Sequence, residues 1–318
     1  MSSSNIDRCG FMIYHLNVGR IGPCEMKRII DKGYCNGYTI GLHEMGQVVF
    51  QCRMAKENGD IVWLNQPNFD SKKESLSEFM ARDAKAVKIL KDQGLWDTVA
   101  GFHWDEPLLR GMNNDDFLAM TKALYEEYGK RIYPVFSTYE VTGHKGNVTD
   151  PDANTQFLKY ASKYITDIAF DSYDYDVRPE YQHKFSGAFT KLQEKMPEID
   201  SGEAYYRTYL KKLKNLMLGE PNIWFYPNAR QNMTWGGYKS DEDYCIAHLE
   251  FFLKLLKEEK HPGGIHLYNW KTWNYNNISL DVLFDRDNPD RWVRYEEAIK
   301  KACKEVNQMK LNPAKIKL

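Results

Sequence analysis

The stretch Val99-Ala-Gly-Phe-His-Trp104-Asp105-Glu106-Pro107 joins a short apolar run to an acidic pair and a proline. Its first six residues have the length and composition of a buried β-strand, and Pro107 ends the strand. Similar runs recur along the chain. The eight predicted strands are Phe11 to Leu16, Gly37 to Leu42, Ile61 to Leu64, Val99 to Trp104, Ile132 to Phe136, Asp167 to Phe170, Asn222 to Tyr226 and Gly264 to Tyr268.

Amphipathic segments with helix-start signals lie between these runs. Ser71-x-x-Glu74 and Ser240-x-x-Asp243 resemble capping boxes, and Asp150-Pro151 and Asn288-Pro289 place proline in a first helical turn. Eight strand-helix alternations favour an α/β fold with a single closed (β/α)8 TIM barrel over an open doubly wound sheet. No G-x-G-x-x-G turn follows the first strand, so we expect no dinucleotide cofactor and, more broadly, no cofactor.

One domain accounts for the 318 residues. We expect the barrel to occupy residues 1–308, with a helical insertion around 177–219, where two helical patterns precede the seventh strand. The basic segment 309–318 is expected to be a poorly ordered tail.

Charge and composition narrow the class of protein. Lys and Arg total 43 against 44 Asp and Glu, so the net charge of -1 offers no footprint for nucleic acid or a membrane surface. Without a long apolar run or a leading signal sequence, we expect a cytoplasmic protein, or a secreted one if a signal peptide has been removed. The six cysteines form no C-x-x-C pair and are expected to be free thiols.

The active site of such a barrel forms where the strands end, so the polar and aromatic residues just after each run are its candidates. Catalytic candidates are Glu106, Asp105, Asp171 and Asp174. Substrate-binding candidates are His15, Trp104, Glu140, Tyr173, Asn228, Tyr268, Asn269, Trp270 and Trp273. Carboxylates, amides and flat aromatic rings together suit a carbohydrate substrate.

Glu106 is the expected general acid. Cleavage of a glycosidic bond needs one protonated carboxyl and a second carboxylate, and a neighbouring ring such as Trp104 would raise the pKa of Glu106 by excluding water. The alternative is that Glu106 caps the following turn or pairs with Arg110, four residues on.

Strand alternation assigns directions to the other candidates. If Asp171 points into the barrel, Ala169 does so too, while Ile168 and Phe170 face the helices, and Asp174 reaches the rim.

On the eighth strand Ile265 and Leu267 face outward, whereas His266, Tyr268 and Trp270 face inward. Trp270 would then floor a sugar subsite, and His266 would be a core histidine.

The Asp105-Glu106-Pro107 string after the fourth strand resembles the acid motif of the barrel glycoside hydrolases. In many of their families the acid is a glutamate in an N-E-P or D-E-P string, which assigns that role to Glu106. Large retaining families also carry a nucleophilic glutamate after the seventh strand, but the segment from Trp224 to Ala229 contains none. The second carboxylate would then be Asp171 or Asp174, acting as nucleophile or base.

Within that superfamily the chain is similar to the substrate-assisted group, the chitinases of family 18 and hexosaminidases of family 20. The resemblance implies that Asp105 orients a substrate acetamido group, with Tyr173 and Trp270 as the inward tyrosine and late tryptophan. The family 18 acidic run is missing, because Val99, Phe102 and Trp104 stand where it needs aspartates.

Two other functions stay open. Glu44, Glu106, Glu140 and Asp171 would suit a divalent metal in a barrel sugar isomerase or lyase, and an inactive barrel would keep the aromatics only to bind carbohydrate.

Overall fold

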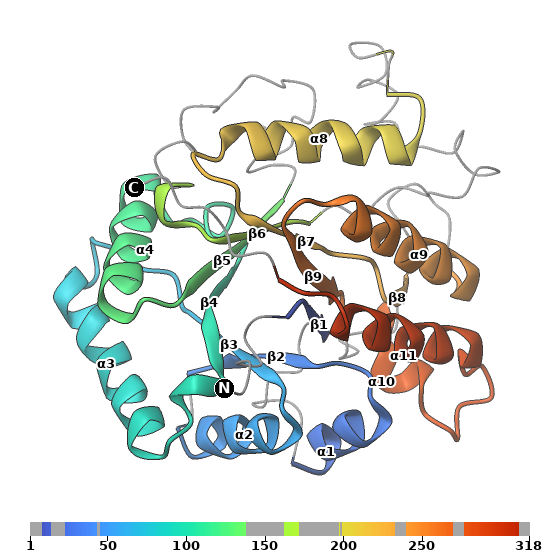
Figure 1. Ribbon diagram of the computed structural model, residues 1–318, viewed down its shortest axis with the longest axis horizontal. Helices are drawn as coiled ribbons and strands as arrows, with labels where there is room; N and C mark the ends of the chain where they lie inside the picture. The colour runs from blue at the N-terminus through green and yellow to red at the C-terminus, as the bar shows by residue number, and fades with distance from the viewer. Residues whose placement is uncertain are drawn as a thin grey trace.

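A closed barrel of eight parallel strands forms the centre of the molecule (Figure 1). The computed structural model describes residues 8–13, 23–42, 45–137, 162–171, 197, 199–232, 240–269 and 277–311. Around the barrel the strands are β1 (Gly10–Ile13), β2 (Gly37–Gly41), β3 (Ile61–Asn65), β4 (Val99–Asp105), β5 (Arg131–Ser137), β6 (Asp167–Asp171), β7 (Asn222–Phe225) and β9 (Pro262–Leu267). All eight predicted strands are present, so the predicted (β/α)8 fold is confirmed.

Helices surround the sheet on its outer face (Figure 1). They are α1 (Pro23–Lys32), α2 (Met45–Asn58), α3 (Leu76–Asp92), α4 (Asn114–Tyr128), α8 (Gly202–Leu216), α9 (Glu242–Glu258), α10 (Leu280–Leu283) and α11 (Val293–Asn307), with short 3-10 turns at Trp96–Thr98 and Ser162–Tyr164. Outside the barrel, β8 (Arg230–Asn232) pairs antiparallel with β10 (Asn277–Ser279).

Helix α3 begins four residues later than its sequence signal suggested. Its capping box uses Ser75 and Glu78, whose side chains bond each other's backbone N–H groups. The expected box fails because its two residues have other partners. The Ser71 N–H donates to the Asp116 carboxylate of α4 at 3.0 Å, and the Glu74 carboxylate pairs with Arg82 at 3.0 Å.

Two other predicted helix starts are also displaced. The N-cap of α9 is Asp241, not Ser240, and its carboxylate accepts from the Tyr244 N–H at 2.8 Å. Asn288-Pro289 forms a turn instead of opening a helix, because the Asn288 carbonyl accepts from the Arg291 N–H at 3.2 Å; α11 begins at Val293. Asp150-Pro151 lies outside the described residues.

Two apolar layers stabilise the fold. One fills the space between sheet and helices and includes Ile168, Phe170, Ile265 and Leu267. The other fills the barrel and includes Ala169. The predicted outward faces of Ile168, Phe170, Ile265 and Leu267 and the inward faces of Ala169 and Tyr268 are therefore confirmed, whereas Trp270 lies outside the described residues.

Large aromatic rings occupy the middle of the barrel. Tyr133 stacks on Trp224 with ring centroids 4.8 Å apart, and Trp63 meets the Tyr133 ring edge-on at 5.1 Å. Glycines make room for them: a Cβ on Gly264 would collide with the Gly10 carbonyl oxygen and with the Trp224 ring. There is therefore no space for a side chain at position 264.

A buried ion pair closes the base of the barrel, at the amino ends of its strands. Arg131, which begins β5, pairs with Asp167, which begins β6. The Asp167 carboxylate also accepts from the Trp224 indole at 2.8 Å, the Asn222 amide at 3.2 Å and the Thr166 hydroxyl at 2.7 Å. This fully buried acid is thus surrounded by donors.

The start of the expected tail also belongs to the folded barrel. The Cys9 N–H donates to the Met309 carbonyl at 3.1 Å, and Arg8 forms a bridge with Lys310. Cys9, Cys35, Cys52, Cys245 and Cys303 are buried free thiols, as predicted for these positions. No helix within the described ranges is long and apolar enough to cross a membrane.

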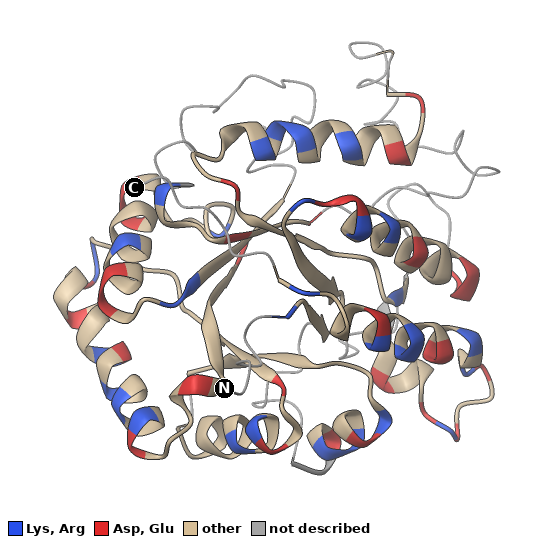
Figure 2. Ribbon diagram, in the orientation of Figure 1, with Lys and Arg blue, Asp and Glu red and all other residues tan. Residues whose placement is uncertain are grey.

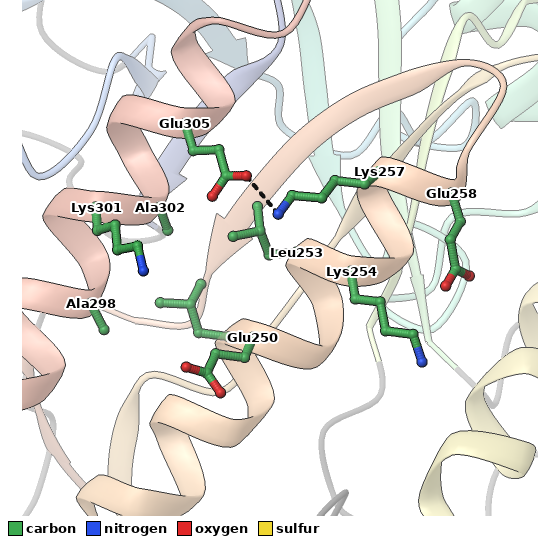
Figure 3. A pocket seen from close by; sticks show the side chains of 10 residues that line it. Glu250, Leu253, Lys254, Lys257, Glu258, Ala298, Lys301, Ala302 and Glu305 are labelled. Atoms are coloured by element: carbon green, nitrogen blue, oxygen red, sulfur yellow. Dashed lines mark ion pairs between the residues drawn. The ribbon is translucent and has the colours of Figure 1, made fainter.

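The outer helices carry charges of both signs along their lengths, whereas the strands are mostly uncharged (Figure 2). Between α9 and α11 a groove has an apolar floor that includes Leu253 and Ala302, and the Lys257–Glu305 ion pair of 2.5 Å lies beside it (Figure 3). This groove belongs to the helix layer and contains none of the predicted site residues.

Candidate active site

The carboxyl ends of the strands bring Asp105 and Asp171 to the same end of the barrel. Asp105 is level with Val135 on β5, which is level with Ala169 on β6, so Asp171 lies two residues further along its strand. Val135 and Ala169 both belong to the cluster inside the barrel. Because side chains alternate, Asp105 and Asp171 project from the same inner face, at the barrel mouth.

Glu106 has an unusual backbone conformation. It is the one non-glycine residue with positive φ (47°) in the described part of the chain. Its N–H donates to the Val135 carbonyl at 3.1 Å, and its carbonyl accepts from the Arg110 N–H at 2.9 Å. A glutamate held in the left-handed region is uncommon, and such residues cluster at functional sites.

Three charged groups meet beside this turn. Arg110 pairs with Asp105, and its guanidinium lies 3.7 Å from the Glu106 carboxylate. The Asp105 and Glu106 side chains are 11% and 21% exposed, against 54% for Arg110. The contact with Arg110 that the sequence offered as an alternative is therefore present.

That contact does not make Glu106 an ordinary carboxylate. The pKa of Glu106 is raised to about 7, because burial and the charge of Asp105 raise it by more than Arg110 lowers it. Removal from water thus outweighs the single cation, which is itself engaged with Asp105. Near neutral pH Glu106 can hold and release a proton.

Across the mouth, Tyr268 follows β9 and packs against the cluster inside the barrel. The guanidinium carbon of Arg230 lies 4.6 Å from the centre of the Tyr268 ring. Burial raises the pKa of Tyr268, Arg230 lowers it, and the charges of Asp171, Asp105 and Glu106 each raise it. Three of the four candidate acids therefore act electrostatically on Tyr268, and a contact of Tyr268 with substrate stays a prediction.

A buried polar layer lies beneath the mouth. The His103 ring contacts the Asn65 side chain with Nδ1 and Oδ1 3.1 Å apart, and the Tyr133 hydroxyl lies 3.3 Å from His266 Nδ1. His266 is fully buried, as expected of a core histidine. The sequence interpretation missed His103, although its position two residues before Asp105 places it on the same inner face.

Trp104 corrects one prediction. It is fully buried in the layer between sheet and helices, where its ring meets Phe117 of α4 edge-on at 6.3 Å. Because Asp105 points inward, its neighbour Trp104 must point outward. The interpretation of Trp104 as a substrate-binding ring and as the wall beside Glu106 is wrong.

Asn228 and Asn269 lie at strand ends as predicted, but both are buried. The Asn228 side-chain oxygen accepts from the Arg230 N–H at 3.3 Å, and that of Asn269 accepts from the Ser279 hydroxyl at 2.5 Å. Both residues therefore hold the segments that follow β7 and β9, and a direct contact with substrate stays a prediction.

Six predicted site residues lie outside the described residues: His15, Glu140, Tyr173, Asp174, Trp270 and Trp273. The same holds for Glu44 of the alternative metal site. Among the residues that the structure does describe, no three His, Cys, Asp or Glu side chains are grouped to hold a metal ion.

No protein-family model and no curated protein matches the chain. Solved structures do. A family GH2 β-galacturonidase from Eisenbergiella tayi has a TM-score of 0.54 at 12% identity, over 90% of this chain and 48% of that one. A GH113 β-1,4-mannanase has a TM-score of 0.50 at 10% identity, over 90% and 92% of the two chains.

A family 1 β-glucosidase from Thermotoga maritima also has a TM-score of 0.50, at 12% identity, over 87% of this chain and 85% of that one. At such identities the likeness concerns the fold. The chain is a (β/α)8 barrel similar in architecture to those of glycoside hydrolases.

Proposed function

We propose that this protein is a glycoside hydrolase that cleaves an O-glycosidic bond in an oligo- or polysaccharide, with Glu106 as the general acid. The observation that carries the proposal is the conformation and the pKa of Glu106. This strand-end glutamate has a φ of 47° and lies beside Asp105, and its own pKa is raised to about 7, mainly by burial. A proton donor with a pKa near the working pH combines correct protonation with driving force for transfer.

Asp171 is the second carboxylate of the proposal. It projects inward from β6, which is two strands away from β4. Its charge, like that of Glu106, raises the pKa of Tyr268. Asp105 is less suited, because Arg110 already pairs with it; its negative charge instead helps to keep the proton on Glu106. Asp174 remains the alternative, and substrate assistance would give the orienting role to Asp105.

An activity screen tests the reaction class. The protein is incubated with 4-nitrophenyl glycosides and oligosaccharides, with and without 2-acetamido groups, and NMR records the first anomer released. We expect hydrolysis of at least one glycoside; faster cleavage of the acetamido set would indicate substrate assistance. Retention without that preference would indicate a covalent intermediate, with carboxyl groups about 5–5.5 Å apart, whereas inversion would indicate a separation of about 6.5–9.5 Å.

Two results would overturn the proposal. Binding of sugars without cleavage of any would identify a carbohydrate-binding barrel. Activity that EDTA abolishes and Mn²⁺ restores would identify metal-dependent chemistry instead.

A further inference from the structure

Arg230 places a positive charge on the rim opposite the proposed acid. In the closed sheet β4 and β9 are the fourth and eighth strands, so they face each other across the barrel (Figure 1). Glu106 follows β4 and Tyr268 follows β9, with the Arg230 guanidinium carbon 4.6 Å from the Tyr268 ring centre. A sugar bound between the two rims would have Glu106 at one side and Arg230 at the other.

The backbone around Arg230 is fixed from several directions. Arg230 pairs with Ser279 in the β8–β10 ribbon, and its N–H donates to Asn228 Oδ1 at 3.3 Å. Its carbonyl accepts from the Ser240 hydroxyl at 2.8 Å. On the other side, the Ala229 N–H donates to the Tyr268 carbonyl at 2.5 Å. The ring that supports the guanidinium is therefore tied to the segment that carries it.

This arrangement pre-organises a planar cation. Stacking on an aromatic face restricts the arginine side chain, which lowers the entropy lost when the guanidinium binds a ligand. A guanidinium forms two parallel hydrogen bonds with a carboxylate, a geometry that a lysine cannot copy. A carboxylate is thus a ligand group that fits the guanidinium.

The charges at the mouth set where such a ligand group must lie. The carboxylates of Asp105 and Asp171 would repel an acidic sugar, and Arg110 is paired with Asp105. Arg230, which contacts Tyr268 on the rim opposite β4, would attract the carboxylate toward that rim. This orientation would leave the glycosidic oxygen toward Glu106.

We propose that Arg230, supported by Tyr268, is a specificity-determining residue that binds the carboxylate of a uronic acid in the subsite next to the cleaved bond. The proposal rests on the function proposed above and names its substrate class.

The test uses pairs of 4-nitrophenyl glycosides that differ only at C6. Glucuronide is compared with its methyl ester and with glucoside, and galacturonide with galactoside, in both anomers. We expect kcat/KM on the preferred uronide to exceed that on its neutral partners by about 10- to 100-fold, the range for a hydrogen-bonded charge. In Arg230→Gln this ratio should fall to near one, and in Arg230→Lys to an intermediate value.

Arg286→Gln is the matched control, because Arg286 is an exposed arginine in the segment between α10 and α11. It should leave the ratio unchanged. A wild-type enzyme that prefers neutral glycosides, or a ratio that Arg230→Gln does not alter, would overturn the inference while leaving the proposed hydrolase intact.

Calorimetric titration separates failure of the inference from failure of the function. The wild type, Arg230→Gln and Arg286→Gln are titrated with sodium D-glucuronate and sodium D-galacturonate, and with the corresponding neutral hexoses. Uronate binding that only Arg230→Gln weakens would support the subsite even if no glycoside were cleaved. Equal binding of uronate and hexose, or no binding of either, would overturn it.

Discussion

The two ends of the barrel both contain acids paired with arginine, but the pairs differ in their balance. At the base, the fully buried Asp167 accepts from Arg131, Trp224, Asn222 and Thr166. At the mouth, Asp105 and Glu106 share the half-exposed Arg110. At the base, hydrogen-bond donors surround the Asp167 carboxylate. At the mouth, Glu106 is partly buried and shares a single cation with Asp105.

This difference separates structure from chemistry. A buried acid with a full set of donors stabilises one geometry, provided that all its partners remain. An acid with an incomplete set exchanges a proton near neutral pH, which is the property that acid catalysis needs. The same residue types therefore serve stability at one end of the barrel and reactivity at the other.

Breaking the base should have the largest effect on folding. Asp167→Ala removes the carboxylate and leaves the largely buried Arg131 without its counter-ion, which should lower the free energy of unfolding by about 3–5 kcal/mol. Urea denaturation measures this change. Activity per folded molecule should stay close to the wild-type value, because the mouth is untouched.

Glu106→Gln should have the converse effect to Asp167→Ala, because it should reduce activity and not stability. It should leave the free energy of unfolding within about 1 kcal/mol of wild type while activity falls steeply. Equal stability losses in Asp167→Ala and Glu106→Gln would remove the distinction between the two ends.

Asp83 on α3 sharpens the comparison, because it is buried like Asp167 but lacks that set of donors. Its carboxylate oxygens have no hydrogen-bond partner among the described residues, and burial raises its pKa to about 7 despite nearby Arg82 and Gln66. The unfolded chain releases this proton near pH 3.9. Stability should therefore fall as pH rises from about 4 to 7, and stay low above that range.

Asp83→Asn should remove this loss and raise the free energy of unfolding at pH 8 by about 2–4 kcal/mol, with little change at pH 4. Asp92→Asn on the same helix is the control, because Asp92 forms an exposed pair with Lys88. Equal gains at both pH values would contradict the account.

Removing either charge beside Glu106 should shift the pH profile of activity modestly, and the two substitutions should shift it in opposite directions. Arg110 lowers the pKa of Glu106 and Asp105 raises it. If protonated Glu106 is required, Arg110→Gln should move the basic limb of the kcat/KM profile to higher pH, and Asp105→Asn should move it to lower pH, each by about half a unit to one unit.

Arg294→Gln serves as the control for these shifts. Arg294 pairs with Glu242 and Asp243 on the surface, so the limb should not move. Shifts of the same sign in Arg110→Gln and Asp105→Asn would exclude Glu106 as the group that titrates.

The strands and the position of Glu106 were predictable because they depend on local patterns. An apolar run that ends in polar residues marks a barrel strand wherever it occurs, and Asp171 follows such a run. The start of α3 was not predictable, because Ser71 bonds Asp116, which is distant in sequence. A capping-box motif depends only on residues close in sequence and cannot show a contact with a distant residue.

Trp104 shows why a neighbour in sequence need not be a neighbour in space. Adjacent strand residues face opposite sides, so the ring beside the acid pair packs against Phe117 outside the barrel. The approach of Arg110 to Asp105 depends on the turn that begins at Glu106. The sequence does not predict the φ of 47° at Glu106, because this region of backbone conformation favours glycine and not glutamate.

The most direct test of Glu106 as the acid is the dependence of Glu106→Gln on the leaving group. A 2,4-dinitrophenyl glycoside leaves without protonation, whereas an alkyl glycoside or an oligosaccharide needs the proton. We expect Glu106→Gln to lower kcat/KM by about 10²–10⁴-fold on the natural type of leaving group and far less on the dinitrophenyl glycoside. An equal loss on both substrates would contradict the account.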